Sequence, residues 1–224
     1  MVSSRKDHRS SDQIRPMAMK AGVLSRSDGS CRYTCGDSIV VGSVVGPMVE
    51  MQADVSQTCR LNVTVYGSSL DGGPASRVMH VEKFIRGALE QVILLRNFPR
   101  SCIKLSVQVI NDGGSVWACA LMACTAALVN AGIPMRGIPS ASSCVVLKNG
   151  EIVVDPSGDE EKLASAHVFV ATMDRHAILV VDTDGVLTRE SFKEAVEVAS
   201  CAAHASRDFI NQYFLDFSEK LLKD

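Results

Sequence analysis

The stretch INDGGSVWACALMACTAALVNAGIPMRG, residues 110–137, decides the fold class of this chain. From position 115 to 129 almost every residue is apolar or small, which predicts a helix that is buried on all sides. Asn130, Gly132 and Pro134 form its stop signal. The helix is too short, and its flanks are too polar, to span a membrane. We expect the rest of the chain to be organised around it.

The Gly113-Gly114 pair before this helix has two interpretations. Backbone N–H groups at a helix start can cradle a phosphate. The same two glycines can also form a tight turn from strand to helix. A bare glycine pair is a weak motif, so the turn is the preferred interpretation from the residues alone.

Strand patterns dominate the N-terminal half. Short apolar runs and turn residues over 14–54 predict three short strands, the last closed by Gly46-Pro47. Residues 60–67 and 102–110 alternate between apolar and polar, as half-buried strands do.

Two further helices follow from apolar periodicity. Residues 77–95 predict a helix whose buried stripe is Val78, Val81, Ile85, Ala88, Leu89 and Val92. Thr188 is expected to cap a long final helix. Its predicted stripe is Phe192, Ala195, Ala199, Ala202, Phe209, Tyr213, Phe217 and Leu221.

Between these helices the chain returns to strands. Residues 142–155 predict a hairpin that turns at Asn149-Gly150. A short charged segment, 158–165, separates it from strands at 166–173 and 177–185. This order predicts an α/β fold, a mixed β-sheet layered with helices including one long C-terminal helix. Residues 1–13 are polar and predict a mobile tail, which leaves 14–224 as one domain.

Composition limits the classes of function. The formal net charge of the 224 residues is −2, so any nucleic-acid-binding patch must be local. The chain has neither an apolar run of membrane-spanning length nor a signal-peptide pattern. Its eight cysteines include no CxxC pair, which indicates reduced thiols in a cytosolic or nuclear protein. No spacing supports a zinc site, and we expect neither a metal nor a cofactor.

Three segments occur in the order of a known family. They are RPMAMKAGVLSRSDGSCRYTCGDSIVVGSVVGP (15–47), SRVMHVEKFIRGALEQVILLRNFPRSCI (76–103) and GGSVWACALMACTAALVNAGIPMR (113–136). Over about residues 14–215 the chain resembles the ribonuclease PH family, in particular the ring subunits of the eukaryotic RNA exosome. The resemblance implies a ribonuclease PH-like fold for the domain at 14–224.

Active members of this family use inorganic phosphate to attack the terminal phosphodiester of RNA. Their helix start reads Gly-Ser/Thr-Arg, but Val116 stands here in place of the arginine that binds phosphate. Their two metal-binding aspartates align with Glu161 and His167, and a neutral histidine supplies no negative charge to a magnesium ion. The resemblance therefore implies a degenerate, non-catalytic relative without catalytic residues.

The resemblance also implies a nucleic-acid contact on the helix over 77–95. Arg77 aligns with the family's second phosphate-binding arginine, and Lys83 and Arg86 follow on the same helix. We predict that these three residues bind RNA. The alternative is that they form an ordinary solvated helix surface.

The implied function is that of a non-catalytic subunit of the RNA exosome core ring. Such a subunit supports 3′-to-5′ RNA processing and degradation, including rRNA maturation, by architecture and by binding the RNA path. The expected partners are other ribonuclease PH-like subunits and RNA, in the nucleus (including the nucleolus) and the cytoplasm; the isolated chain is expected to be a homodimer. The alternative is a homodimeric nuclease that binds DNA or RNA outside the exosome, for example in apoptotic DNA degradation.

Overall fold

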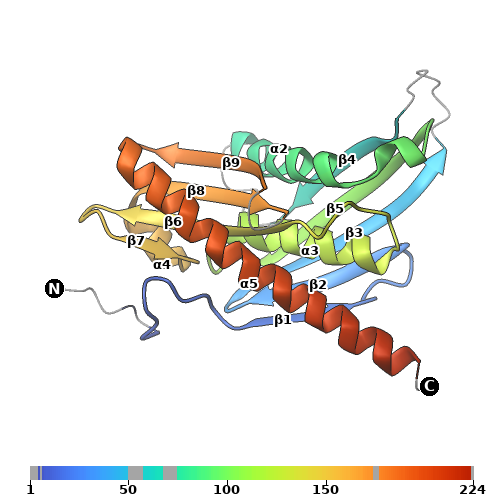
Figure 1. The fold of residues 1–224 in the computed structure, drawn as a ribbon, viewed down its shortest axis with the longest axis horizontal. Helices are drawn as coiled ribbons and strands as arrows, with labels where there is room; N and C mark the ends of the chain where they lie inside the picture. The colour runs from blue at the N-terminus through green and yellow to red at the C-terminus, as the bar shows by residue number, and fades with distance from the viewer. Residues whose placement is uncertain (1–4, 6, 50–57, 68–74, 174–176, 223–224) are drawn as a thin grey trace.

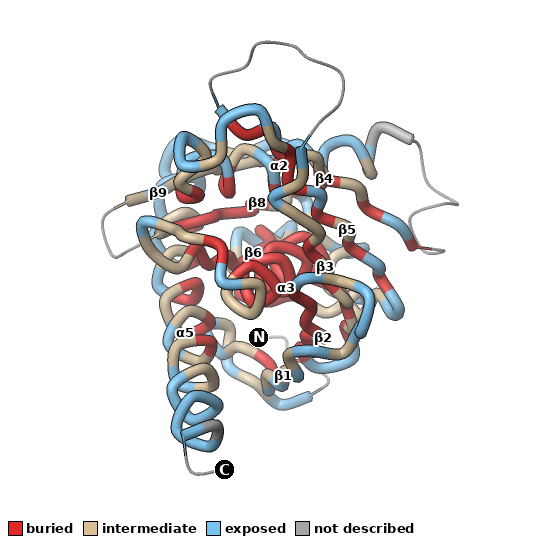
Figure 2. The backbone as a smooth tube through the Cα atoms, turned by 90° about the vertical axis from the view of Figure 1, so that its right-hand side faces the viewer, coloured by how far each residue is buried: buried red, intermediate tan, exposed pale blue. Residues whose placement is uncertain are grey.

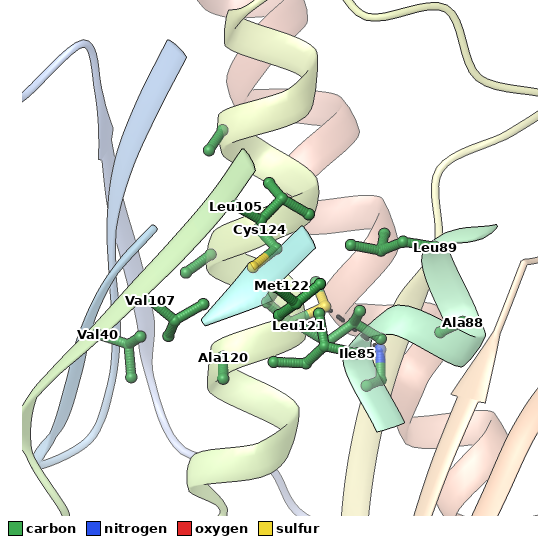
Figure 3. Close-up of a cluster of buried hydrophobic side chains, with 14 of the residues drawn as sticks. Val40, Ile85, Ala88, Leu89, Leu105, Val107, Ala120, Leu121, Met122 and Cys124 are labelled. Atoms are coloured by element: carbon green, nitrogen blue, oxygen red, sulfur yellow. Dashed lines mark hydrogen bonds between the residues drawn. The ribbon is translucent and has the colours of Figure 1, made fainter. Parts of the chain in front are cut away.

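The computed structural model describes residues 5, 7–49, 58–67, 75–173 and 177–222. At its centre lies helix α3 (Val116–Asn130), and every residue of this helix from 116 to 128 is buried. Its side chains meet apolar residues of neighbouring strands and of a second helix, as Leu121, Met122, Val107 and Ile85 show in Figure 3. The predicted all-round burial of this helix is confirmed.

One face of α3 packs on a five-stranded sheet. Its order in space is β1 (Met17–Ala21), β2 (Gly29–Cys35), β3 (Ser38–Val49), β5 (Ser101–Asn111) and β4 (Arg60–Tyr66). Only β4 and β5 are parallel, so this sheet is mixed. The prediction that Gly46-Pro47 closes a strand was wrong. Strand β3 continues through this dipeptide to Val49, with a register shift that lets its pairing with β5 resume at Met48.

A second sheet is antiparallel throughout. Its order is β7 (Ile152–Val154), β6 (Ser140–Leu147), β8 (Ala164–Thr172) and β9 (Ile178–Gly185). The predicted hairpin is confirmed, since β6 and β7 pair and the Gly150 amide donates to Leu147 O across the turn at 2.9 Å. The described strands thus form two sheets, whereas the sequence predicted one.

Helices cover both sheets (Figure 1). Helix α2 (Ala75–Val92) lies over β4 and β9. It ends three residues before the predicted end at residue 95, where the short 3₁₀ helix η1 (Leu95–Asn97) begins. The short α4 (Gly158–Leu163) precedes β8. The long α5 (Arg189–Leu221) runs across β6 and β8, and Thr188 caps it as predicted by accepting from the Ser191 amide at 3.2 Å.

The predicted stripe of α5 is correct only for the part of the helix that lies on the sheet. Ala195, Ala199 and Ala202 are buried, but Phe192 and Phe217 are 38% and 37% exposed. Figure 2 shows why for the C-terminal end, where the helix extends past the body of the protein and its tube turns from red to blue. Periodicity locates the apolar face of a helix but not how far a sheet extends beneath it.

The described part of the predicted tail packs against the domain. Arg5 is 8% exposed, and the Val154 amide donates to Ser11 O at 2.8 Å. The segment therefore contacts α4 through Arg5 and β7 through Ser11, while most of its other described residues are exposed. Polar composition alone does not reveal these contacts, because the residues that Arg5 binds lie about 150 positions further along the chain.

Candidate functional site

A cavity of about 660 Å³ lies where α2, the start of α3, α4, β8 and β9 meet. Four of the residues singled out from the sequence line it together: Arg77, Val116, Glu161 and His167. Lys83 and Arg86 are exposed on α2 and do not line this cavity. At about 100° per residue, Lys83 and Arg86 point roughly 120° and 180° away from Arg77 around the α2 axis. The packing of β9 on α2 decides which of these directions faces the cavity.

The glycine turn before α3 is held by the protein itself. The Arg15 guanidinium donates to Gly113 O at 2.8 Å and to Gly114 O at 3.0 Å. The amide of Gly113 donates to Ser38 Oγ at 3.1 Å, and a Cβ atom on Gly114 would lie 2.3 Å from Pro156 O. These contacts agree with the tight-turn interpretation and leave both glycine carbonyls bound.

The amide of Ser115, the residue just before α3, already has an acidic partner. Ser115 has a positive φ of 56°, and its N–H donates to Glu161 Oε1 at 2.7 Å. Burial raises the pKa of Glu161, and although the Ser115 hydrogen bond and the Arg77 charge oppose this effect, the pKa stays above its ordinary value. A carboxylate from α4 therefore sits at the helix start, where an external anion would have to bind.

His167 is the cavity's half-buried base. Burial lowers its pKa, and the nearby Arg77 charge adds to this effect, while Asp184 across the strand pair only partly offsets it. These effects favour the neutral form of the His167 imidazole. A neutral imidazole cannot replace the negative charge of a carboxylate ligand.

Sequence reasoning missed three further carboxylates in the cavity, those of Asp112, Asp182 and Asp184. With Glu161 they outnumber the two cations, Arg77 and Lys162. The sequence did contain one indication of this arrangement. Asp182 and Asp184 are two positions apart in a predicted strand, so their side chains lie on the same face of the sheet. Which face points inward depends on how β9 packs.

The apolar wall of the cavity is part of the core. The Trp117 and Phe169 rings stack at 4.1 Å between centroids with 12° between planes, and Phe84 packs against both. Trp117 is 8% exposed and Phe169 is 7% exposed. With its ring stacked on Phe169, Trp117 acts as a packing residue and leaves no free face for a nucleobase.

Within the described residues, no group of three or more His, Cys, Asp or Glu side chains could hold a metal ion. The described helices likewise include none that is long and apolar enough to cross a membrane.

Comparison with known proteins agrees with this geometry. The models of the 3′ exoribonuclease family match residues 13–134 (domain 1) and 137–201 (domain 2). The exosome complex component Rrp41 of Pyrococcus furiosus is 31% identical over 97% of this chain and 92% of the relative. Rrp41 of Archaeoglobus fulgidus is 32% identical, over a region that covers 97% of this chain and 90% of that relative.

Solved structures give the same fold. The crystal structure of rice (Oryza sativa) Rrp46 superimposes with a TM-score of 0.85 at 28% identity, covering 92% of this chain and 98% of that one. The Archaeoglobus fulgidus exosome with RNA bound to the active site has a TM-score of 0.82 at 19% identity, covering 92% of each chain. At 19% identity, the second match supports the fold and no finer conclusion.

Proposed function

Because the chain belongs to the ribonuclease PH family of 3′ exoribonucleases, we propose that it is a non-catalytic subunit of an RNA exosome core ring. Its likeness to rice Rrp46 and archaeal Rrp41 over nearly the full length of each supports this role. It supports 3′-to-5′ RNA processing and degradation, including rRNA maturation, in the nucleus (including the nucleolus) and the cytoplasm. Its partners are other ribonuclease PH-like subunits and RNA. Without them, two copies of the chain pair as a homodimer.

One observation carries the non-catalytic part of this proposal. The Glu161 carboxylate occupies the Ser115 amide, and the adjacent Val116 offers no guanidinium. A phosphate at this amide would have to displace the Glu161 carboxyl group, and no guanidinium at position 116 is present to hold it there. Phosphorolysis needs this phosphate as its nucleophile.

The proposal is tested by a phosphorolysis assay. The purified chain receives single-stranded RNA, magnesium and inorganic phosphate, beside an active family member as positive control. We expect no nucleoside diphosphates above the background of a reaction without protein. Phosphate-dependent shortening of the RNA that disappears in Glu161→Gln would refute the non-catalytic assignment.

RNA binding is the second part of the proposal, and Arg77 is its central residue. Arg77 lies in the first turn of α2 and lines the cavity together with four carboxylates, which already supply it with acidic neighbours. The case for RNA contact rests on the resemblance, which places Arg77 at the family's second phosphate-binding arginine. Arg77→Ala should weaken binding about equally for RNAs of different sequence and lower the salt slope by about one.

Fluorescence anisotropy at several salt concentrations measures both effects. Lys193→Ala, which removes an exposed cation from α5, is the matched control and should change neither. Lys83→Ala and Arg86→Ala test whether the RNA also follows the outer face of α2. An Arg77→Ala variant with unchanged affinity and slope would place the RNA path elsewhere.

A further inference from the structure

Arg5 links the N-terminal segment to α4 through a paired hydrogen bond. Its Nε donates to Glu160 Oε1 at 2.8 Å, and its Nη2 donates to Glu160 Oε2 at 2.9 Å. Nη2 also donates to the carbonyls of Val154 and Asp155, at 3.1 and 3.0 Å. The side chains of Arg5 and Glu160 are only 5% and 18% exposed. This is a fixed fork-to-carboxylate contact and not a solvated surface pair.

Glu160 also closes the first turn of α4. The Ser157 amide donates to Glu160 Oε2 at 2.7 Å, which completes a capping box. Burial acts to raise the pKa of Glu160, but the hydrogen bonds from Arg5 and Ser157 outweigh it and leave that pKa lowered. A helix of six residues is too short to be stable alone, so its position depends on such outside contacts.

The next residue, Glu161, points about 100° further around α4 and has a different partner. There its carboxylate accepts the Ser115 N–H at 2.7 Å inside the cavity. Consecutive glutamates therefore connect two distant regions, the N-terminal segment through Glu160 and the start of α3 through Glu161. The first residue of α4 is also tied to the glycine turn, because the Gly158 amide donates to Gly113 O at 3.0 Å. The Arg5 contact is the one that holds α4 from the side of the N-terminal segment.

We propose that Arg5 is a positioning residue for the cavity: by holding Glu160 it fixes α4, so that Glu161 stays on the Ser115 amide and keeps the start of α3 closed to inorganic phosphate. This inference rests on the proposed non-catalytic function. It adds that the closure is maintained from outside the cavity, by a residue ten positions before Arg15 and far from α3 in the sequence.

The test follows the Ser115 amide by NMR in the full ¹⁵N-labelled chain during titration with inorganic phosphate at pH 7. In the wild type the Ser115 signal should not move. In Glu161→Ala and in Arg5→Ala it should shift and saturate, with at least tenfold tighter apparent binding than any wild-type response. Arg5→Lys keeps the charge but not the fork, so its response should fall between those of wild type and Arg5→Ala.

Arg9→Ala is the matched control. Arg9 belongs to the same segment and donates to Asp155 O and Gln13 O, but not to Glu160. It should leave the Ser115 signal as insensitive as in the wild type. Should Arg5→Ala fail to fold, Glu160→Gln removes the same ion pair from the other side and should open the site equally.

Three results would overturn the inference. The first is a folded Arg5→Ala or Glu160→Gln chain whose Ser115 signal does not shift with phosphate. The second is an Arg9→Ala shift equal to that of Arg5→Ala. The third is phosphate binding at Ser115 in the wild type. Failure here is distinguishable from failure of the proposed function. A wild-type chain that degrades RNA with phosphate refutes the function, whereas an inactive chain whose Ser115 amide is indifferent to Arg5 refutes only this inference.

Discussion

The buried pair between Arg15 and Asp155 offers a sharp test of what holds the two sheets together. Asp155 is 3% exposed, and its carboxylate accepts from Arg15 Nε at 2.8 Å, Arg15 Nη2 at 2.7 Å and the Arg15 amide at 2.8 Å. Asp155→Asn leaves the shape nearly unchanged but removes the charge. Arg15, itself 7% exposed, then stays buried without its counter-ion.

Removing one partner of a buried ion pair costs about 3–5 kcal/mol, because the other charge is left uncompensated. Arg15 keeps its bonds to Gly113 O and Gly114 O, so we expect a loss near the lower end, about 3 kcal/mol. Burial raises the pKa of Asp155, but the hydrogen bonds and charge of Arg15 outweigh it and leave this pKa lowered. The stabilisation is therefore present above the ordinary value of 3.8 and is lost as the pH falls through the lower folded value.

Urea unfolding followed by circular dichroism at pH 7 and again near pH 3 measures this cost. Asp208→Asn is the control, because Asp208 is 67% exposed and its contact with Arg207 should contribute less than about 1 kcal/mol. The difference between wild type and Asp155→Asn should be large at pH 7 and shrink at pH 3. A cost below about 1 kcal/mol at pH 7, or an equal cost at both pH values, would refute the reasoning.

Two further predictions follow from the packing and from Glu161. A Cβ atom on Gly42 would lie 2.7 Å from Ala123 O, so Gly42→Ala should push β3 away from α3 and lower the free energy of unfolding by about 1–3 kcal/mol. Gly87→Ala on α2 is the control, because the nearest atom to its new Cβ lies at 3.4 Å, and it should not destabilise the protein. Equal urea midpoints for the two variants would contradict this prediction. The raised pKa of Glu161 means that its contribution to stability is fully present below about pH 4.5 and is lost as the pH rises through the folded value. Glu161→Gln should therefore gain stability relative to wild type at pH 7 and not at pH 4, and a thermal-melting series with no such pH dependence would count against it.

The sequence by itself determined the features that depend on near neighbours. Continuous apolar character from 115 to 129 identifies α3 without knowledge of its surroundings, because a helix with no polar face must be buried. The Asn149-Gly150 turn and the Thr188 cap are equally local. The family could also be predicted, since its motifs are strings of residues. The loss of the phosphate-binding arginine could be read at Val116 in the same way.

Only the tertiary structure decided which distant residues meet. Strand patterns did not separate two sheets from one, because strand pairing depends on partners that no local pattern specifies. Arg5 is polar and near the terminus, and its burial depends on Glu160 about 150 positions away. Likewise, the packing of β9 on α2 brings Asp182, Asp184 and Arg77 into one cavity and leaves Lys83 outside it. Periodicity defines the faces of an element, but only packing determines what each face meets.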